Sequence, residues 1–470
     1  MKQVQLSLFG VLVFVIGLAT LYTSYRGAVY AMAACCLFGA TLALGLGGIG
    51  VMPAQLFLAF FAIRAFNLAG GKRIGDAFAL DKPGFWLLCT CVWGVFGAIV
   101  LPRLLRGSTL VFPVDHDLGG TALLQPLGPV SGNLSQAFYC VGDVVVYACM
   151  YALLKYRGAY RALASGMLLL TLLDVAAGVI DIGTHAVGLD VMSVIKTAQY
   201  ADLSGEEMGG LVRITGTFPE TSAFSTFTLP LFVFCLNLWL VGYRPRLSGA
   251  LAAAAGTLLL LSTSGTAYVG LSAYMFVQLF SRPGRVSSDA GARKRRLWII
   301  AACAGLLGSL YVVLFLPVVA NVLTDFVNAT VFGKADSSSG VERMSWNMQG
   351  VTNFMDTYGI GVGLGSIRTS SFLVVLIANL GVVGVVCYAL FIGKSLFTPV
   401  AAHYPLTERA VCHAARHAMI ATLIVASISA GVFELGSCFY LFAAAAGALP
   451  SRAPRRAVSR EVWVPQGVKE

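Results

Sequence analysis

The stretch "SFLVVLIANLGVVGVVCYALF", residues 371–391, indicates the class of fold, because it runs through a whole helix length without a charged residue. About 18 consecutive apolar residues are enough to cross a bilayer as an α-helix. Similar runs recur along the 470 residues, which are 58% hydrophobic and 11% charged, with a mean hydropathy of +0.82. The runs are continuous, whereas barrel strands alternate polar and apolar residues. The sequence therefore predicts an all-α, polytopic transmembrane helical bundle.

On both sides of this stretch the same pattern recurs, and we expect thirteen spans, or twelve if two early runs form one broken element. The predicted spans are 6–22, 28–46, 50–66, 84–104, 136–155, 161–181, 220–242, 248–262, 266–281, 297–320, 371–397, 412–432 and 434–449. The pair at 248–281 is short for two crossings and is interrupted by "STSGT", which predicts a turn near the outer surface. We divide the chain into N-terminal helices (1–204), a second membrane region (205–450) and a basic cytoplasmic tail (451–470).

The net charge of +11 comes mostly from short basic segments between the spans. This is the positive-inside pattern of a membrane protein, so we expect contact with anionic lipid and no nucleic-acid partner. The segments expected in the cytoplasm are 155–161, 242–246, 281–296 and 407–417. They agree with one another through the span count, and a thirteen-span count places the N-terminus outside.

Three long segments remain on the extracytoplasmic side: residues 105–135, 182–219 and 321–370. Long ordered loops are uncommon unless they have a function. In the third loop, "GVERMSWNMQGVTNFM" (340–355) has apolar residues near helical spacing, and we expect a short helix lying on the membrane surface.

The eleven cysteines lie almost entirely inside predicted spans and are interpreted as small apolar residues, not as a disulfide framework. The five histidines form no ligand set, because three are expected in the cytoplasm and His116 and His185 are far apart in sequence. No zinc-protease, EF-hand, P-loop or dinucleotide motif is present. We therefore expect neither a metal nor a cofactor.

Three arginines, Arg213, Arg343 and Arg368, stand on the outer face, where the positive-inside rule makes arginine rare. A guanidinium presents a planar fork of donors that suits phosphate and stays charged at any working pH. Together the three could hold a pyrophosphate. The alternative is that each snorkels to lipid headgroups or pairs with an acid, as Arg343 could with Glu342.

Glu220 follows a proline at the start of a predicted span. One interpretation is structural, since a carboxylate at a helix N-terminus is stabilised by the helix dipole and can cap free N–H groups. The other is functional, as a general base or as a clamp for an arginine, because acidic residues at membrane depth are usually functional. Asp174, Asp181 and Glu434 also lie in or near spans and receive no role.

These motifs resemble the O-antigen ligase and O-antigen polymerase superfamily of bacterial inner-membrane glycosyltransferases. The resemblance covers roughly residues 205–450 and rests on the order of its motifs. They are "R-x-x-G-x-F-P-E-x-S" from Arg213, "LLSTSGTAYVGL" (260–271), an "R…W" helix, "GVGLGS" (361–366) and "ANLGVVG" (378–384). The superfamily usually carries Ser-Arg-Gly where this chain reads "STSGT".

The resemblance implies a substrate: a glycan attached through pyrophosphate to an undecaprenyl lipid, transferred at the periplasmic face without a metal. Such polymerases often work beside a flippase and a chain-length regulator. Arg213, Arg343 and Arg368 match the arginines used around the pyrophosphate, and Glu220 matches an acidic position of polymerase-like members. We assign catalytic roles to Glu220, Arg213 and Arg368.

The predicted substrate-binding residues include the glycine-rich stretch before Arg368. The glycines would let backbone N–H groups approach a phosphate oxygen, with Arg368 supplying charge to the departing pyrophosphate and Ser370 and Ser371 beginning the next helix as caps. The predicted binding residues are Arg343, Gly361, Gly363, Gly365, Ser366 and Ser370.

One difference from the ligase sequence motif distinguishes a polymerase from a ligase. Ligases carry a His-Asn pair, then nine residues, then G-x-x-G; here Gly381 and Gly384 fit that frame, but Ser370 and Ser371 stand in place of the pair. This favours a surface-polysaccharide polymerase over a ligase acting on a lipid or protein acceptor. A transporter or flippase for anionic solutes is the third alternative. It is disfavoured because the arginines gather at one face and no internal repeat is evident.

Overall fold

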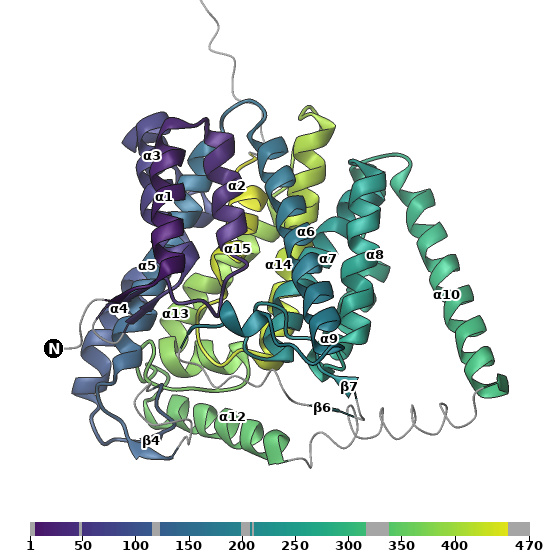
Figure 1. Ribbon diagram of the computed structural model, residues 1–470. Helices are drawn as coiled ribbons and strands as arrows, with labels where there is room; N and C mark the ends of the chain where they lie inside the picture. Colours follow the sequence, from purple (N-terminus) through teal and green to yellow (C-terminus); the bar gives the residue numbers. More distant parts are fainter. Residues whose placement is uncertain are drawn as a thin grey trace, which may run out of the picture.

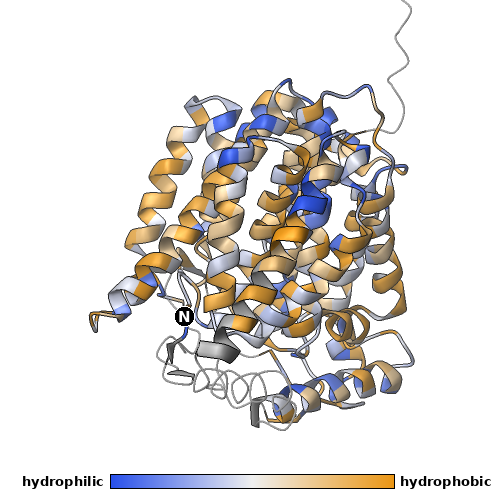
Figure 2. Ribbon diagram, turned by 90° about the vertical axis from the view of Figure 1, so that its right-hand side faces the viewer, coloured by the Kyte–Doolittle hydropathy of each residue, from blue (hydrophilic) through white to orange (hydrophobic). Residues whose placement is uncertain are grey.

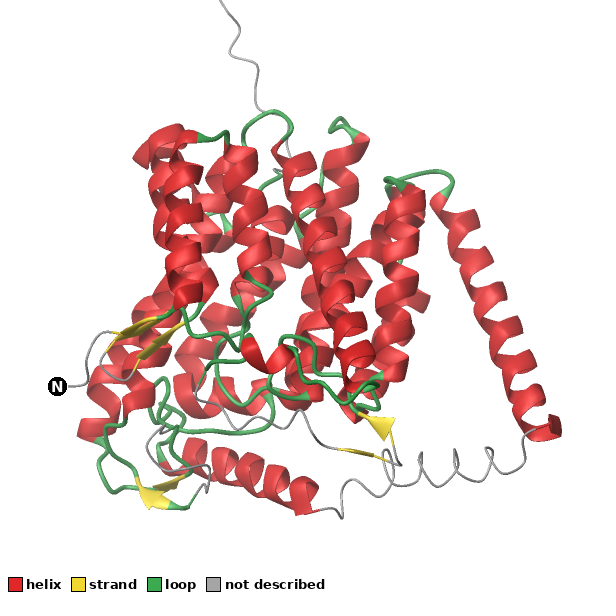
Figure 3. Cartoon of the chain, viewed as in Figure 1, coloured by secondary structure: helices red, strands yellow, loops and turns green. Residues whose placement is uncertain are grey.

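A computed structural model describes residues 5–46, 49–114, 123–198, 207–208, 211–315 and 338–449. Within them about 72% of the residues are helical, and the strands are short, forming one three-stranded sheet and two strand pairs (Figure 3). The predicted fold class, an all-α polytopic bundle, is confirmed.

The first half of the bundle consists of six helices (Figure 1). They are α1 (Leu8–Tyr22), α2 (Tyr25–Cys35), α3 (Pro53–Gly75), α4 (Pro83–Leu104), α5 (Ser131–Leu153) and α6 (Ala159–His185). The span predicted at 28–46 is the one most changed, because its second half turns out of the helix after Cys35 and forms the strand β2 (Leu44–Leu46).

The second half contains the most buried of the candidate spans, α7, which packs against α6, α8, α9 and α14. Its helices are α7 (Thr221–Val241), α8 (Pro245–Leu261), α9 (Gly265–Phe280), α10 (Ala290–Phe315), α12 (Ser338–Asp356), α13 (Phe372–Phe397), α14 (Leu406–Ser429) and α15 (Ser437–Gly447). The predicted turn at "STSGT" separates α8 from α9, and Thr263 in it has a positive φ of 53°.

Each of the thirteen predicted spans contains a helix, although α2 covers only the first half of 28–46 and residues 316–320 of the span 297–320 lie outside the described residues. Among the described helices, seven are long and apolar enough to cross a membrane by length and composition. These seven are α3 with the short helix after it (Pro53–Phe78), α4, α5, α6, α7, α13 and α14. Figure 2 shows hydrophobic residues along the helices, with the hydrophilic residues gathered toward their ends. This distribution suits a bundle whose middle faces lipid and whose ends face water.

The segments predicted to be outside and the basic segments predicted to be cytoplasmic lie at opposite ends of the bundle (Figure 1). The strand pairs β4 (Leu110–Val111) with β5 (Gln125–Pro126) and β6 (Glu207–Met208) with β7 (Leu211–Val212) lie at one end. The expected surface helix is present there as α12, which crosses this end of the bundle. The basic turns before α6, α8 and α10 lie at the opposite end.

Cysteine labelling tests which end faces outward. Ser345 on α12 and Ser288 before α10 are both exposed, and each can be changed to cysteine conservatively. In a background where the exposed Cys303 is alanine, we expect an impermeant maleimide added to whole spheroplasts to label Ser345→Cys and to leave Ser288→Cys unlabelled until the membrane is opened. The reverse pattern would contradict the predicted orientation.

Candidate functional site

The glycine-rich stretch before Arg368 is packed into the bundle. Gly361, Gly363 and Gly365 all have positive φ, between 77° and 99°, and residues 361–367 are buried. A Cβ atom at Gly363 would lie 2.6 Å from the carbonyl oxygen of Gly97 on α4, and one at Gly365 would lie 2.2 Å from that of Gly132 on α5. The glycines therefore allow the loop backbone to touch helix backbone, which no other residue would permit.

The loop also completes a break in α13. Gly381, inside this helix, has φ 60° and ψ −168°, so the helical hydrogen-bond ladder is interrupted there. The loop satisfies the freed groups: the N–H groups of Val362 and Gly363 donate to the carbonyl oxygens of Ala378 and Asn379 at 2.8 and 3.1 Å. Loop and helix are thus one folding unit, since neither satisfies its backbone without the other.

Four consecutive N–H groups, from residue 367 to residue 370, each donate to a different segment of the protein. Ile367 donates to the Asn379 side chain at 3.4 Å, Arg368 to Phe112 O at 2.8 Å, Thr369 to Gly431 O at 3.3 Å, and Ser370 to the Asn347 side chain at 2.8 Å. This fixes the backbone on either side of Arg368 to α13, α12 and two loops.

The side chain of Arg368 is left at the surface, with its guanidinium over the ring of Trp346 on α12, 4.5 Å from the ring centroid. Partial desolvation by the neighbouring residues lowers the pKa of this side chain, the carboxylates of Glu342 and Glu220 raise it, and the charge of Arg343 lowers it. An arginine stays cationic under such influences. The charges of two other predicted site residues, Glu220 and Arg343, therefore reach Arg368.

Glu220 occupies the N-cap position of α7, as its structural interpretation requires, but its side chain makes no capping hydrogen bond to the helix backbone. Instead Oε1 accepts a hydrogen bond from the hydroxyl of Ser222 at 2.6 Å. The residue is half-buried and lines a cavity. Its carboxylate is thus held by a side chain at the wall of that cavity.

Arg213 lies on the segment that leads toward α7. It is half-buried and follows β7. The contacts of the residues after it tie this segment to α6, because the N–H groups of Thr215 and Gly216 both donate to the carboxylate of Asp181 at 2.8 Å. Its predicted role beside Arg368 stays a prediction.

The remaining predicted binding residues are used inside the fold. Gly361 donates its N–H to the Thr357 hydroxyl at 3.2 Å, and Ser366 is held by hydrogen bonds to the Asn133 amide and the Val362 carbonyl at 2.9 and 3.0 Å. Ser371 is the N-cap of α13, without a side-chain cap bond. The geometry offers an anion the side chain of Arg368, and the predicted phosphate contacts of the glycines stay a prediction.

A cavity of about 400 Å³ opens beside this group, between the first turns of α7, the end of α14 and the segment that leads into α15. Glu220 and Gly431 line it, and a Cβ atom at Gly431 would come 4.0 Å from Arg368 Nε. Most of its wall is apolar, including Phe227 and Phe439. The cavity therefore joins a charged edge to an apolar interior.

Sequence reasoning missed a pair of acids at the inner wall. Glu434 lines both this cavity and a neighbouring one of about 210 Å³. Its carboxyl group and that of Asp143 on α5, which is 2% exposed, influence one another electrostatically. One oxygen of each, Glu434 Oε2 and Asp143 Oδ2, is buried without a hydrogen-bond partner among the described residues. The two residues lie far apart in sequence, so no local signal could have paired them.

The fold and the site together define a polytopic helical membrane protein with a mixed-charge, arginine-bearing group at one end of its bundle. Neither a protein-family model, nor a curated protein, nor a solved structure matches this chain significantly.

Proposed function

We propose that this protein is a glycosyltransferase that polymerises a surface polysaccharide, an exopolysaccharide or an O-antigen, from repeats carried on undecaprenyl pyrophosphate. It would act in the bacterial inner membrane, at the periplasmic face. One observation carries the proposal: Glu220 lines a mostly apolar cavity, and Arg368, whose pKa is shifted by the charges of Glu220 and Arg343, lies beside Gly431 in the cavity wall. A charged edge suits a diphosphate, and an apolar interior suits a lipid tail.

In this proposal the guanidinium of Arg368 holds the diphosphate, with Arg343 adding positive charge from α12. Negative charge grows on the diphosphate as the bond from the anomeric carbon to its oxygen breaks, and fixed cations stabilise that charge. An acceptor hydroxyl forms the new bond to the anomeric carbon, and its proton passes to the carboxylate of Glu220. The lipid diphosphate leaves. Holding donor and acceptor together at the membrane lowers the barrier further.

The proposal is tested by following lipid-linked glycans after deletion of the gene. Loss of polymerase activity should leave single repeats on the lipid and remove the polymer, and the wild-type gene should restore it. The complementary test supplies purified protein in liposomes with lipid-linked repeats and looks for a ladder of longer glycans. Full-length chains left unattached would indicate a ligase instead, and an unchanged glycan profile would contradict both functions.

A further inference from the structure

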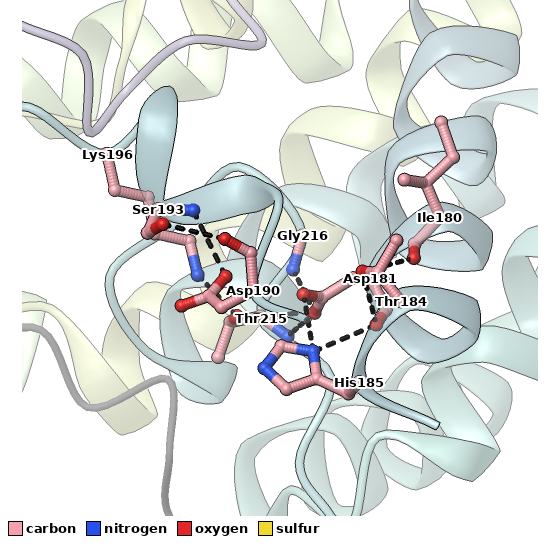
Figure 4. Close-up of polar contacts among 9 residues, drawn as sticks. All are labelled: Ile180, Asp181, Thr184, His185, Asp190, Ser193, Lys196, Thr215 and Gly216. Carbon is pink, nitrogen blue, oxygen red and sulfur yellow. Dashed lines mark hydrogen bonds and ion pairs between the residues drawn. The ribbon is translucent and has the colours of Figure 1, made fainter. Parts of the chain in front are cut away.

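The C-terminal end of α6 carries a cluster that the proposed function does not use. Asp181 and His185 lie one helical turn apart, and Asp190 follows in the next turn of the chain (Figure 4). One ligand atom from each of the three residues lies within 4.8 Å of the others. Asp181 Oδ1 is 3.2 Å from His185 Nδ1. The same nitrogen lies 2.9 Å from the backbone carbonyl oxygen of Asp181.

The two oxygens of Asp181 have different surroundings. Oδ2 accepts three hydrogen bonds, from the N–H groups of Thr215 and Gly216 at 2.8 Å each and from the Thr215 hydroxyl at 3.3 Å. Oδ1 is buried and accepts no hydrogen bond, its near neighbour being His185 Nδ1 at 3.2 Å, and the residue as a whole is 1% exposed. A buried carboxylate oxygen without a donor is costly unless a cation compensates it. Figure 4 shows the Asp181 carboxylate beside the ring of His185.

The other charged neighbours leave the cluster net negative. Asp190 accepts a hydrogen bond from the Ser193 N–H through Oδ1 at 3.1 Å, which leaves its second oxygen for a ligand. Lys196 donates to the Thr215 hydroxyl at 2.7 Å and offsets one of the two acids. The two carboxylates and the one ammonium, without His185, sum to a charge of −1, which favours a cation.

We propose that Asp181, His185 and Asp190 bind one divalent transition-metal ion. An imidazole nitrogen with two carboxylate oxygens suits Zn²⁺ and its neighbours better than Ca²⁺ or Mg²⁺, which take oxygen ligands. Three protein ligands leave further positions for water. Because Asp181 also holds Thr215 and Gly216, the ion fastens the segment after Arg213 to α6. Its role is structural, and the proposal does not rest on the proposed function.

The test uses tag-free, full-length protein in detergent, stripped with a chelator and titrated with Zn²⁺. We expect one ion per chain by elemental analysis and a rise in the unfolding temperature, since an ion that binds only the folded state stabilises it. His185→Gln and Asp190→Asn should each weaken binding about tenfold or more. Asp181→Asn keeps an oxygen for the Thr215 and Gly216 donors and should also weaken binding.

The matched control is His403→Gln, which changes an exposed histidine outside the cluster. This variant should bind Zn²⁺ as the wild-type protein does. Unchanged binding in both the His185 and the Asp190 variants would place the ion elsewhere and overturn the proposal. So would the absence of saturable binding by wild-type protein, or a preference for Ca²⁺ over Zn²⁺, which would remove the role given to the imidazole.

Discussion

Replacing Arg368 with alanine should lower polymer formation by about two to three orders of magnitude, the usual cost of removing a group that stabilises developing negative charge. The side chain stands at the edge of the cavity, over Trp346, and its backbone is anchored on both sides. The truncation should therefore remove the cation without moving the loop. The measurement is polymer length and amount in cells that carry the variant, normalised to the protein level in the membrane.

Two further variants make this result specific. Arg368→Lys keeps the charge but loses the planar fork of donors, and we expect it to recover only part of the activity. Arg106→Ala removes an exposed arginine just beyond the end of α4 and should leave polymer unchanged. Full activity of Arg368→Lys would contradict a two-point grip on the diphosphate, and full activity of Arg368→Ala would remove Arg368 from the mechanism.

The second large effect is expected on stability, at Gly381. An alanine there would adopt a positive φ of 60° and place its Cβ 2.1 Å from the carbonyl oxygen of Ile360, which is backbone and cannot swing away. This glycine-only backbone region costs about 1–3 kcal/mol and overpacking about 1–3 kcal/mol. We expect Gly381→Ala to destabilise the protein by about 2–6 kcal/mol, the sum of these two costs, measured as a lower unfolding temperature in detergent.

Substitutions at two other glycines distinguish backbone strain from steric overlap as the cause of the destabilisation. Gly393 lies in the same helix, and a methyl group added there would have nothing within 4 Å, so Gly393→Ala should be neutral or slightly stabilising. Gly70 also has open space but a positive φ of 73°, so Gly70→Ala should show the backbone strain alone. If Gly381→Ala lowered the unfolding temperature no more than Gly70→Ala does, the close approach of the loop to α13 at Gly381 would contribute nothing to stability.

Hydrophobicity is a local property, and the sequence therefore placed a helix at each of the thirteen spans and α12 across the end. The charged group was partly predictable, because arginine is rare in outer segments and Arg343 and Arg368 both lie in one of them. Close approaches between segments that are distant in sequence could not be predicted. Nothing local in the sequence pairs Asp181 with Thr215 or Asp143 with Glu434, and the glycines that suggest an open anion-binding turn instead pack against α4, α5 and α13.

The anchoring of residues 367–370 to four separate segments bears on the kinetics of binding. A loop that must fold around its ligand delays capture and loses affinity to ordering. Here the backbone that carries Arg368 is already ordered by its hydrogen bonds, with the guanidinium resting on an indole ring. If this end of the bundle binds an anion as proposed, we expect the backbone at Arg368 to need no reordering, so that capture would be limited by diffusion of the ligand.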